Sequence, residues 1–158
     1  MNITIARPSE ADALTEIAFA AKRHWGYPEH WIAHWCSLLT VTPDFIATHA
    51  TYAARDGQSI LGFTALAQSA GILCLEHLWV LPSAAGRGVG RALFHQAQQR
   101  ARDLGFDTFE IESDPHAAGF YERMGGERIG TNTTLLDGQP RELPIFRCHT
   151  SHESDRIV

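Results

Sequence analysis

Apolar and polar residues alternate at the start of the chain and then change to helical spacing. Residues 2–5 alternate strictly, which predicts a short strand. Ser9 and Asp12 have the spacing of a capping box, and apolar residues then recur every three or four positions. The pattern therefore predicts a first helix from Ser9 to about Arg23.

Two further helical pieces follow this helix. Gly26, Tyr27 and Pro28 interrupt the first helix because proline cannot continue it. Apolar residues at helical spacing predict a second helix over residues 31–39. A threonine followed by proline predicts the start of a short third helix, over residues 42–49.

The next part of the chain has the pattern of strands joined by tight turns. Three consecutive strands are predicted at residues 51–55, 59–67 and 72–81. Turn signals at residues 56–57 and 69–71 separate them. The run of three therefore predicts an antiparallel meander.

A long helix follows the meander and begins a new type of connection. Apolar residues from Val89 to Leu104 share one helical face, and Gly105 ends the helix. The remaining predicted elements are a strand at 108–112, a helix at 117–124, and two closing strands at 128–131 and 143–148, joined through Asp137 and Gly138. A strand–helix–strand crossover thus interrupts an antiparallel run. This order predicts an α/β fold with a mixed, mostly antiparallel sheet of six to seven strands and helices on both faces.

Length and composition limit the organisation and the partners of the chain. With 158 residues, 44% of them hydrophobic and 20% charged, the sequence is typical of one compact globular domain. We expect this domain to span residues 1–148 and a polar, loose tail to span residues 149–158. The net charge of −5 argues against nucleic acid and against an anionic membrane as partners.

The cysteines and the first residues favour a cytoplasmic location. The three cysteines are odd in number and fit no zinc-binding spacing, which favours a reducing compartment. The first residues have no basic region and no long apolar run, so we expect no signal peptide. His30 and His34 lie four residues apart on a predicted helix near Cys36, but no third ligand accompanies them. We therefore expect no metal.

A glycine-rich turn between the meander and the long helix gives the strongest chemical signal. Gly86, Gly88 and Gly90 alternate there, and glycine lets backbone amides approach a ligand closely. The start of the helix adds unpaired amide donors and partial positive charge, which together favour phosphate or pyrophosphate. Arg87 and Arg91 add two positive charges. The spacing lacks the last glycine of a Rossmann fingerprint and the lysine of a Walker A loop. The alternative is a tight turn that binds nothing.

The turn resembles the pyrophosphate signature of the GCN5-related N-acetyltransferases, the GNAT family. The signature is Gln/Arg-x-x-Gly-x-Gly/Ala, and Gly88 and Gly90 occupy its glycine positions. Ala85 stands at the Gln/Arg position, a departure that removes one side-chain contact. A second block, residues 114–125, resembles the family segment Asn-x-x-Ala-x-x-Phe-Tyr-Glu-Lys-x-Gly, with Asp114 in place of the asparagine. The resemblance covers residues 72–131 in detail.

This resemblance implies the GNAT acyl-CoA N-acyltransferase fold and an enzyme that uses acetyl-CoA without a metal. The acetyl group would pass directly to a primary amine in a ternary complex. Tyr121 matches the tyrosine that serves the family as general acid for the departing CoA thiolate; the alternative is a packed aromatic residue with its hydroxyl at the surface. The residues implied in cofactor binding are Leu78, Trp79, Val80, Gly86, Arg87, Gly88, Val89, Gly90, Arg91, Asp114, Ala117 and Phe120.

Glu76 is the candidate for the base that deprotonates the amine. Strand alternation puts it on the face of Leu78 and Val80, and a partly buried carboxylate would have a raised pKa. The alternative is a salt-bridged strand residue. We expect His77 to face the opposite side, in the core. Cys74 shares the face of Glu76, but a cysteine without a paired base is usually inert.

The acceptor pocket is expected near the end of the first helix. The first two helices cover the acceptor side in the family, which implicates His24, Trp25, Tyr27 and Trp31. The alternative is that the two tryptophans simply join the core. The acceptor is either a small-molecule amine or a protein amine, and the family resemblance is compatible with a homodimer. Two rival functions remain: a non-catalytic acyl-CoA-binding module, which Ala85 and Asp114 favour, and transfer of a longer acyl group.

Overall fold

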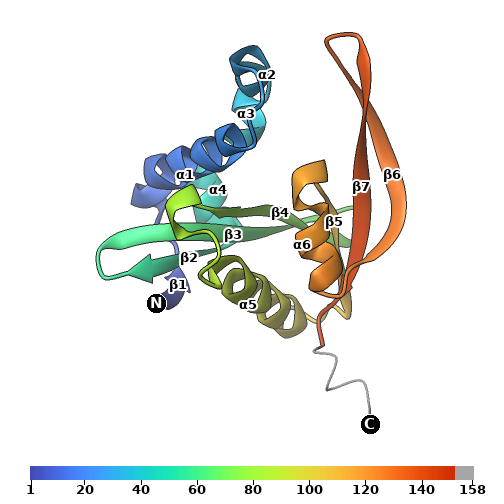
Figure 1. The fold of residues 1–158 in the computed structure, drawn as a ribbon. Helices are drawn as coiled ribbons and strands as arrows, with labels where there is room; N and C mark the ends of the chain where they lie inside the picture. The colour runs from blue at the N-terminus through green and yellow to red at the C-terminus, as the bar shows by residue number, and fades with distance from the viewer. Residues whose placement is uncertain (152–158) are drawn as a thin grey trace. The chain divides into compact units, whose positions relative to one another are not determined.

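The computed structural model describes residues 1–151, and these form a mixed sheet with strand order β1-β2-β3-β4-β5-β7-β6 (Figure 1). The strands are β1 (Asn2–Ile5), β2 (Ala50–Asp56), β3 (Ser59–Ser69), β4 (Ile72–Val80), β5 (Thr108–Glu112), β6 (Glu127–Leu136) and β7 (Gln139–His149). The pairs β1–β2, β2–β3, β5–β7 and β6–β7 are antiparallel, whereas β4 and β5 are parallel. The predicted mixed, mostly antiparallel sheet is therefore confirmed.

Six α-helices and three short 3₁₀ turns accompany the sheet in the described residues. The α-helices are α1 (Ala11–His24), α2 (Glu29–His34), α3 (Cys36–Leu39), α4 (Pro43–Thr48), α5 (Val89–Asp103) and α6 (Ala118–Arg123). The 3₁₀ turns are η1 (Pro8–Glu10), η2 (Pro82–Ala84) and η3 (Pro115–Ala117). None of these helices is both long and apolar enough to cross a membrane.

The chain divides into two compact units whose boundaries fall within β3, β4 and α5. The first unit contains Met1–Leu66 and His77–Gln96, and the second contains Ala67–Glu76 and the described residues from Ala97. In the first unit, α1 and the start of α5 lie on opposite faces of the strands (Figure 1). The predicted single domain over residues 1–148 stays a prediction.

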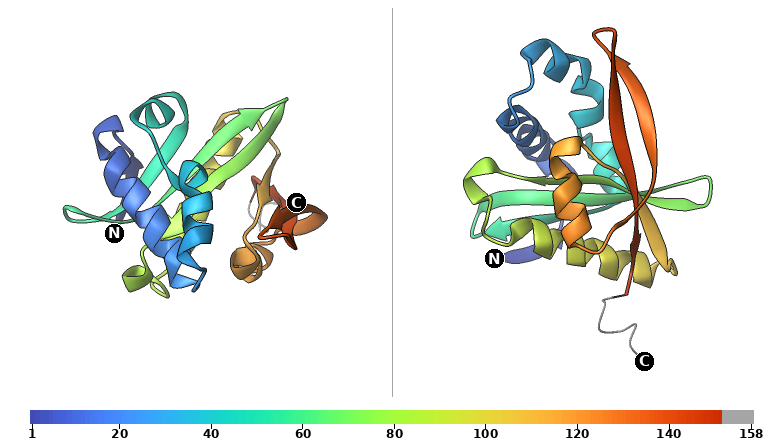
Figure 2. Two further views of the ribbon diagram at one scale, coloured as in Figure 1. Left: turned by 90° about the horizontal axis from the view of Figure 1, so that it is seen from above. Right: turned by 45° about the vertical axis from the view of Figure 1, so that its right-hand side comes forward.

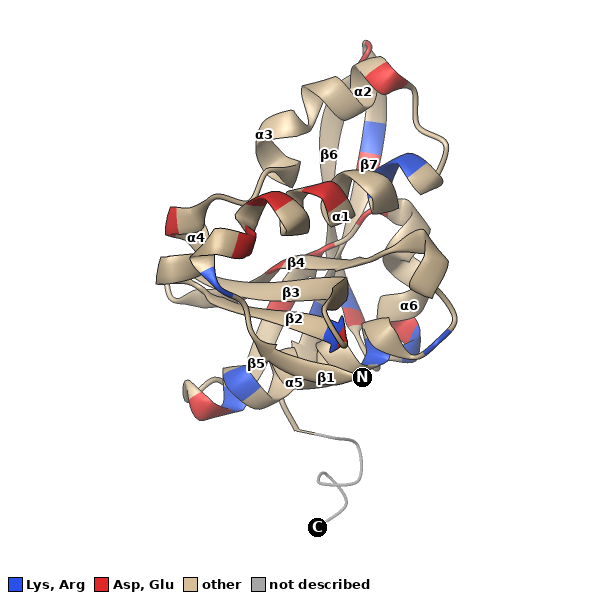
Figure 3. Ribbon diagram, turned by 90° about the vertical axis from the view of Figure 1, so that its left-hand side faces the viewer, with Lys and Arg blue, Asp and Glu red and all other residues tan. Residues whose placement is uncertain are grey.

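The start of α1 differs from the prediction. Ser9 does not cap the helix; it lies inside η1, and the backbone N–H of Arg7 donates to Glu10 Oε1 at 2.8 Å. The acidic residue that closes the first turn is therefore Glu10 rather than Asp12. Asp12 is exposed instead. Figure 3 shows acidic residues along α1.

The predicted second helix is two shorter helices, α2 and α3, separated at Trp35. The Trp35 backbone has φ −88° and ψ 5°, outside regular helical geometry, and its ring is buried. Burial of this large ring thus coincides with the break. The predicted N-cap of α4 is confirmed, because Thr42 Oγ1 accepts a hydrogen bond from the backbone N–H of Phe45 at 3.1 Å.

The closing hairpin is longer than predicted. β6 pairs with residues 139–147 of β7, with a bulge between Arg128 and Gly130. A two-residue turn joins the strands, and its residues Asp137 and Gly138 both have positive φ (Figure 2). Pro140 and Pro144 lie within β7, although proline cannot donate a hydrogen bond to a ladder. Both precede the residues of β7 that pair with β5, which begin at Ile145. The absence of their backbone N–H groups therefore does not interrupt the pairing of β7 with β5.

The predicted tail begins too early at residue 149. His149 is the last residue of β7, and Thr150 is buried. The Thr150 backbone N–H donates to the Asp107 carbonyl at 2.9 Å, and Arg102 Nη2 donates to the Thr150 carbonyl at 2.6 Å. Residues 152–158 of the predicted tail lie outside the described residues.

An ion pair in the first unit ties η1 to the sheet. Arg55 on β2 contacts both carboxylate oxygens of Glu10, with its Nη2 at 2.8 Å from Oε1. The two side chains are only 17% and 12% exposed. The hydrogen bond from Arg55 lowers the pKa of Glu10 from 4.5 to about 2. The hydrogen bond from the Arg7 backbone and the positive charges of Arg55 and Arg7 lower this pKa further.

This pair predicts a pH-dependent contribution to stability. Because the folded-state pKa of Glu10 is lowered, its contribution is complete above pH 4.5 and disappears as the pH falls toward 2. We expect Glu10→Gln to lower the free energy of unfolding near neutral pH by about 1–3 kcal/mol, measured by urea denaturation. The variant should approach the wild type in stability as the pH falls through that window.

The matched control is Glu29→Gln. Glu29 pairs with Arg23 at 3.0 Å, but both side chains are more than half exposed, so water screens the pair. We expect no resolvable loss of stability for this variant. An equal loss in the two variants would show that the Glu10 pair contributes no more than a surface pair.

Candidate functional site

The predicted glycine turn contains two glycines in the left-handed backbone region. Gly86 and Gly88 have φ of +77° and +79°, a region that other residues rarely adopt. A Cβ added at either position would meet no atom within 4 Å, so the turn faces open space. Among the backbone hydrogen bonds outside helices and strands in residues 1–151, none is donated by Gly86, Arg87 or Gly88. The amides of the turn thus remain available, and α5 begins directly after it.

A small core holds the turn in place. The buried residues Ala84, Val89 and Leu93 pack together beside the turn, and Leu78 and Val80 of β4 pack against them. One face of β4 and the first turns of α5 therefore share one core. This packing fixes the turn between two rigid elements.

Gly62 on β3 is a structural requirement that the sequence analysis missed. A Cβ at this position would lie 2.6 Å from the Trp79 carbonyl oxygen and 3.2 Å from the Val80 Cα. Only glycine lets β3 approach β4 so closely at the segment implicated in cofactor binding. The sequence did contain a signal for this close approach, because Gly62 is an isolated glycine within the strand predicted over residues 59–67.

The two arginines near the turn are exposed. Arg87 lies 3.8 Å from the carboxylate of Asp56, with both side chains more than half exposed, which makes a weak surface pair. Arg91 is exposed on the first turn of α5. Both side chains can therefore reorient toward an anion at the turn.

An aromatic cluster lies on the other face of β4 in the first unit. Trp25 and Trp79 rings are 5.9 Å apart, and Tyr27 contacts Trp31 and Trp35 at 5.8 and 4.9 Å. Three of the predicted acceptor residues, Trp25, Tyr27 and Trp31, are thus in one cluster and partly exposed. The fourth, His24, is exposed at the end of α1.

Lys22 is buried at the centre of this cluster. Its Nζ lies 4.1 Å from the Trp35 ring centroid and 5.2 Å from that of Tyr27, and its residue is only 7% exposed. The ring centroids of Trp25 and Trp79 lie 5.7 and 5.9 Å from the same Nζ. The sequence analysis missed this lysine, although it follows Leu14 and Ala18 at four-residue intervals on the buried face of α1.

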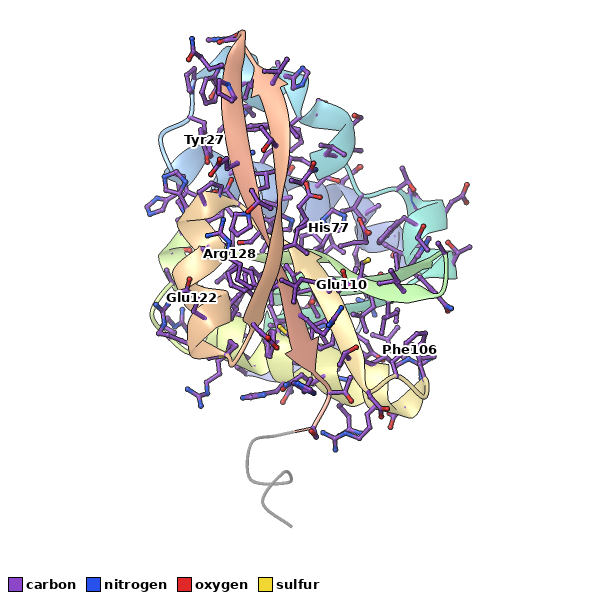
Figure 4. All side chains as sticks on the ribbon, turned by 90° about the vertical axis from the view of Figure 1, so that its right-hand side faces the viewer. Tyr27, His77, Phe106, Glu110, Glu122 and Arg128 are labelled. Atoms are coloured by element: carbon purple, nitrogen blue, oxygen red, sulfur yellow. The ribbon has the colours of Figure 1, made fainter. Side chains whose placement is uncertain are left out.

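His77 orients Trp79 within the cluster. As predicted, His77 is buried, and its Nδ1 accepts a hydrogen bond from Trp79 Nε1 at 3.1 Å. Burial lowers the pKa of His77 to about 4, so its imidazole is neutral near pH 7 and its Nδ1 can accept. Figure 4 labels His77 and Tyr27 among the side chains.

Tyr121 lies in the second unit, in the interior of α6. Its ring contacts Phe120 and Phe146, and the residue is 6% exposed. Burial, with smaller effects of Cys148 and Asp114, raises the pKa of the Tyr121 hydroxyl well above its usual range. The hydroxyl therefore stays protonated near neutral pH.

Asp114 is engaged within the second unit. Its side chain is 7% exposed, and Oδ2 accepts from Arg141 Nη2 at 2.8 Å. Its Oδ1 accepts from the backbone N–H of His116 at 2.8 Å and lies 3.1 Å from His116 Nδ1. The departure from asparagine thus comes with a compensating arginine. The sequence analysis missed Arg141 because β7 was predicted to begin two residues later.

Ala117 and Phe120, the other predicted cofactor residues of this unit, lie at the start of α6. Ala117 ends η3 and precedes α6, and Phe120 is half-buried. The structure thus brings residues 78–80 and 86–91 together in the first unit, and 114, 117 and 120 together in the second.

Glu76 does not have the partial burial that was expected of it. Its side chain on β4 is exposed. On the same strand, burial and then the charges of Glu76, Glu110 and Glu112 raise the pKa of the Cys74 thiol. Cys74 therefore stays a thiol near neutral pH, which argues against a nucleophilic role. Within residues 1–151 no group of three or more metal-binding side chains is found.

Comparisons with known proteins show the family of this chain. Residues 29–138, more than half of the chain, match the family model described as an acetyltransferase (GNAT) domain. The peptidyl-lysine N-acetyltransferase YiaC of Escherichia coli strain K12 is 26% identical over 121 residues, which cover 76% of this chain and 79% of that protein.

Solved structures share the fold. A GCN5-related N-acetyltransferase from Rhodopseudomonas palustris has a TM-score of 0.76 at 19% identity, over 94% of both chains. The PaiA N-acetyltransferase from Thermoplasma acidophilum, in complex with coenzyme A, has a TM-score of 0.72 at 16% identity, over 94% of this chain and 98% of its own. The chain belongs to the GNAT family and is an acetyl-CoA-dependent N-acetyltransferase.

Proposed function

We propose that this enzyme transfers the acetyl group of acetyl-CoA directly to a primary amine while both substrates are bound. The glycine turn carries the proposal. Its amides are available, its two positive-φ glycines face open space, and the positive end of α5 begins at Val89. We call this turn, residues 86–90, the phosphate cradle; a diphosphate fits it without a metal. The Thermoplasma acidophilum relative was solved with coenzyme A, which supports the choice of ligand.

The residues around the cradle have different proposed roles in binding the cofactor. The turn from Gly86 to Gly90 would hold the pyrophosphate, and Arg87 and Arg91 would add charge. The backbone of Leu78–Val80 would align the pantetheine arm. Bound acetyl-CoA supplies the activated acetyl thioester; the protein supplies alignment and proton transfer.

Tyr121 is proposed as the acid for the leaving thiolate. Its raised pKa keeps the proton on the hydroxyl until negative charge develops on sulfur. A protonated donor in a buried setting stabilises that charge more strongly than water would. Asp114, held by Arg141, fixes the loop that leads into the helix of Tyr121.

Glu76 is proposed to remove the amine proton, directly or through water. Its exposure leaves it able to exchange protons with solvent after each cycle. The rival function, a non-catalytic acyl-CoA-binding module, would need neither Glu76 nor Tyr121. Ala85 lacks the side-chain contact that Gln or Arg makes at this position in the family, and this loss fits such a module equally well. A measurement of turnover therefore distinguishes the enzyme from the binding module.

The acceptor is proposed to be a primary amine of a protein or of a small molecule. The Escherichia coli relative is a peptidyl-lysine N-acetyltransferase, which makes a lysine side chain the first acceptor to test. A panel of amines and lysine peptides with acetyl-CoA, followed by release of free thiol, identifies it.

The cradle predicts a loss of cofactor binding in Gly88→Asp. The aspartate would bring a Cβ and a negative charge into the space proposed for the pyrophosphate. We expect the Kd for coenzyme A to rise more than about tenfold, measured by isothermal titration calorimetry. The matched control is Gly105→Asp at the far end of α5, where φ is also positive and nothing lies within 4 Å. Equal affinities in the two variants would place the pyrophosphate elsewhere.

The acid role predicts a selective loss of turnover in Tyr121→Phe. We expect kcat to fall about 100-fold while the Kd for coenzyme A changes little, because only the developing thiolate uses the hydroxyl. Steady-state kinetics and calorimetry separate the two effects. Tyr52→Phe on β2 is the control and should behave as the wild type. An unchanged kcat in Tyr121→Phe would remove Tyr121 from this role.

The base role predicts a pH-dependent defect in Glu76→Gln. We expect kcat/KM to fall about 10- to 100-fold near pH 7, with partial recovery as the pH approaches about 10, where free amine becomes abundant. Glu110→Gln on the neighbouring strand is the control. A defect of the same size at every pH would show that Glu76 serves structure rather than proton transfer.

A further inference from the structure

Arg87 is the only residue of the phosphate cradle with a charged side chain. Within residues 86–90, all of which the structure describes, three are glycines and the fourth, Val89, is buried in the core beside the turn. Arg87 stands between Gly86 and Gly88, where the turn faces open space. An anion at this turn therefore lies within reach of the Arg87 guanidinium as well as of the backbone amides.

A carboxylate from a distant part of the sequence lies beside this guanidinium. Asp56 ends β2, and its Oδ2 is 3.8 Å from Arg87 Nη2. The two side chains are 65% and 55% exposed. Within residues 1–151, Asp56 is the only ion-pair partner of Arg87. The fold thus places one acidic side chain of the β2–β3 hairpin next to the one charged side chain of the cradle.

The pair is weak enough to be exchanged for a stronger one. Water screens two charges that are this exposed, so separating them costs little free energy. A diphosphate offers a guanidinium several charged oxygens, to which it can donate two parallel hydrogen bonds. The Asp56 carboxylate and a diphosphate at the turn are therefore two anions that compete for one cation.

We propose that Asp56 competes with the pyrophosphate of acetyl-CoA for Arg87 and thereby limits the affinity of the phosphate cradle for the cofactor. This inference rests on the proposed cofactor site at residues 86–90. Arg87 leaves the Asp56 carboxylate as it binds the pyrophosphate, and it returns to Asp56 as coenzyme A departs. Asp56 thus favours release of the product, because it offers Arg87 an alternative partner.

The test measures the Kd for coenzyme A by isothermal titration calorimetry at low ionic strength, where exposed charges are least screened. We expect Asp56→Asn to lower this Kd about two- to fivefold, the range that an exposed ion pair supplies. Asp56→Glu keeps the charge and should bind as the wild type does. Arg87→Gln should raise the Kd, and in that background Asp56→Asn should lose most of its effect.

The hairpin that carries Asp56 does not depend on its carboxylate. The two turn residues are Gly57 and Gln58, and Gly57 supplies the φ of +60° that the turn needs. Asp103→Asn is the matched control, because it removes the same charge at the far end of α5. This control should leave the Kd unchanged. A change confined to Asp56→Asn therefore reports the local carboxylate rather than the net charge.

Two results would overturn the competition. The first is an unchanged or raised Kd in Asp56→Asn. The second is an equal effect of Asp56→Asn with and without Arg87, since the carboxylate would then act on the cofactor directly. Dephospho-coenzyme A keeps the pyrophosphate but lacks the 3′-phosphate, so the two- to fivefold change should persist with it. Loss of the change with this ligand would assign Arg87 to the 3′-phosphate and refute the exchange with the pyrophosphate.

Gly88→Asp separates this inference from the proposed function. If this variant binds coenzyme A as tightly as the wild type, the cofactor site at the cradle is wrong and the competition is refuted with it. If Gly88→Asp loses binding while Asp56→Asn has the wild-type Kd, only the competition is refuted. Because the measurement is one of binding, the absence of turnover with every amine tested would refute acetyl transfer and leave the competition supported.

Discussion

The close packing of β4 against β3 and against the start of α5 is the constraint on which the first unit depends. Gly62 allows the backbones of β3 and β4 to approach at Trp79, where a methyl group would collide with the carbonyl oxygen. Leu78 and Val80 then pack on the core that holds Val89 and Leu93. Without this approach the strand would shift, and the glycine turn that follows it would lose its fixed position. The phosphate cradle is thus a consequence of strand packing as much as of its own sequence.

Alternation along β4 lets a single strand serve two purposes. Leu78 and Val80 face the core beneath the cradle, whereas His77 and Trp79 face the aromatic cluster. The hydrogen bond from Trp79 to His77 requires an unprotonated Nδ1, which burial of the imidazole ensures. A shift of one residue in the register of β4 would exchange these two faces. The register therefore couples the proposed cofactor side to the proposed acceptor side.

Local pattern predicted the elements whose formation depends on local signals. The meander, the long helix and the N-cap at Thr42 follow from periodicity, turn residues and capping. The hairpin extends beyond the two predicted strands, because β6 and β7 continue to pair up to Leu136 and Gln139 at the turn. The N-cap predicted at Ser9 does not form, because Glu10 takes its place and is paired with Arg55, 45 residues away in the sequence. Such pairs depend on tertiary contacts that no local pattern shows.

The site residues that sequence analysis missed share one property: each is a polar or small residue made acceptable by a distant partner. Lys22 follows the buried face of α1, where a charge is costly unless its surroundings stabilise it. The rings that do so come from positions 25 to 79, and their convergence is a property of the fold. Arg141, which was also missed, balances the charge of Asp114, the residue that stands where the family has a neutral amide. The aspartate that is paired with Arg141 keeps the loop before Tyr121 fixed, whereas an unpaired aspartate would not. A departure from a family motif is therefore better judged by the partner that the fold brings to the residue than by the residue alone.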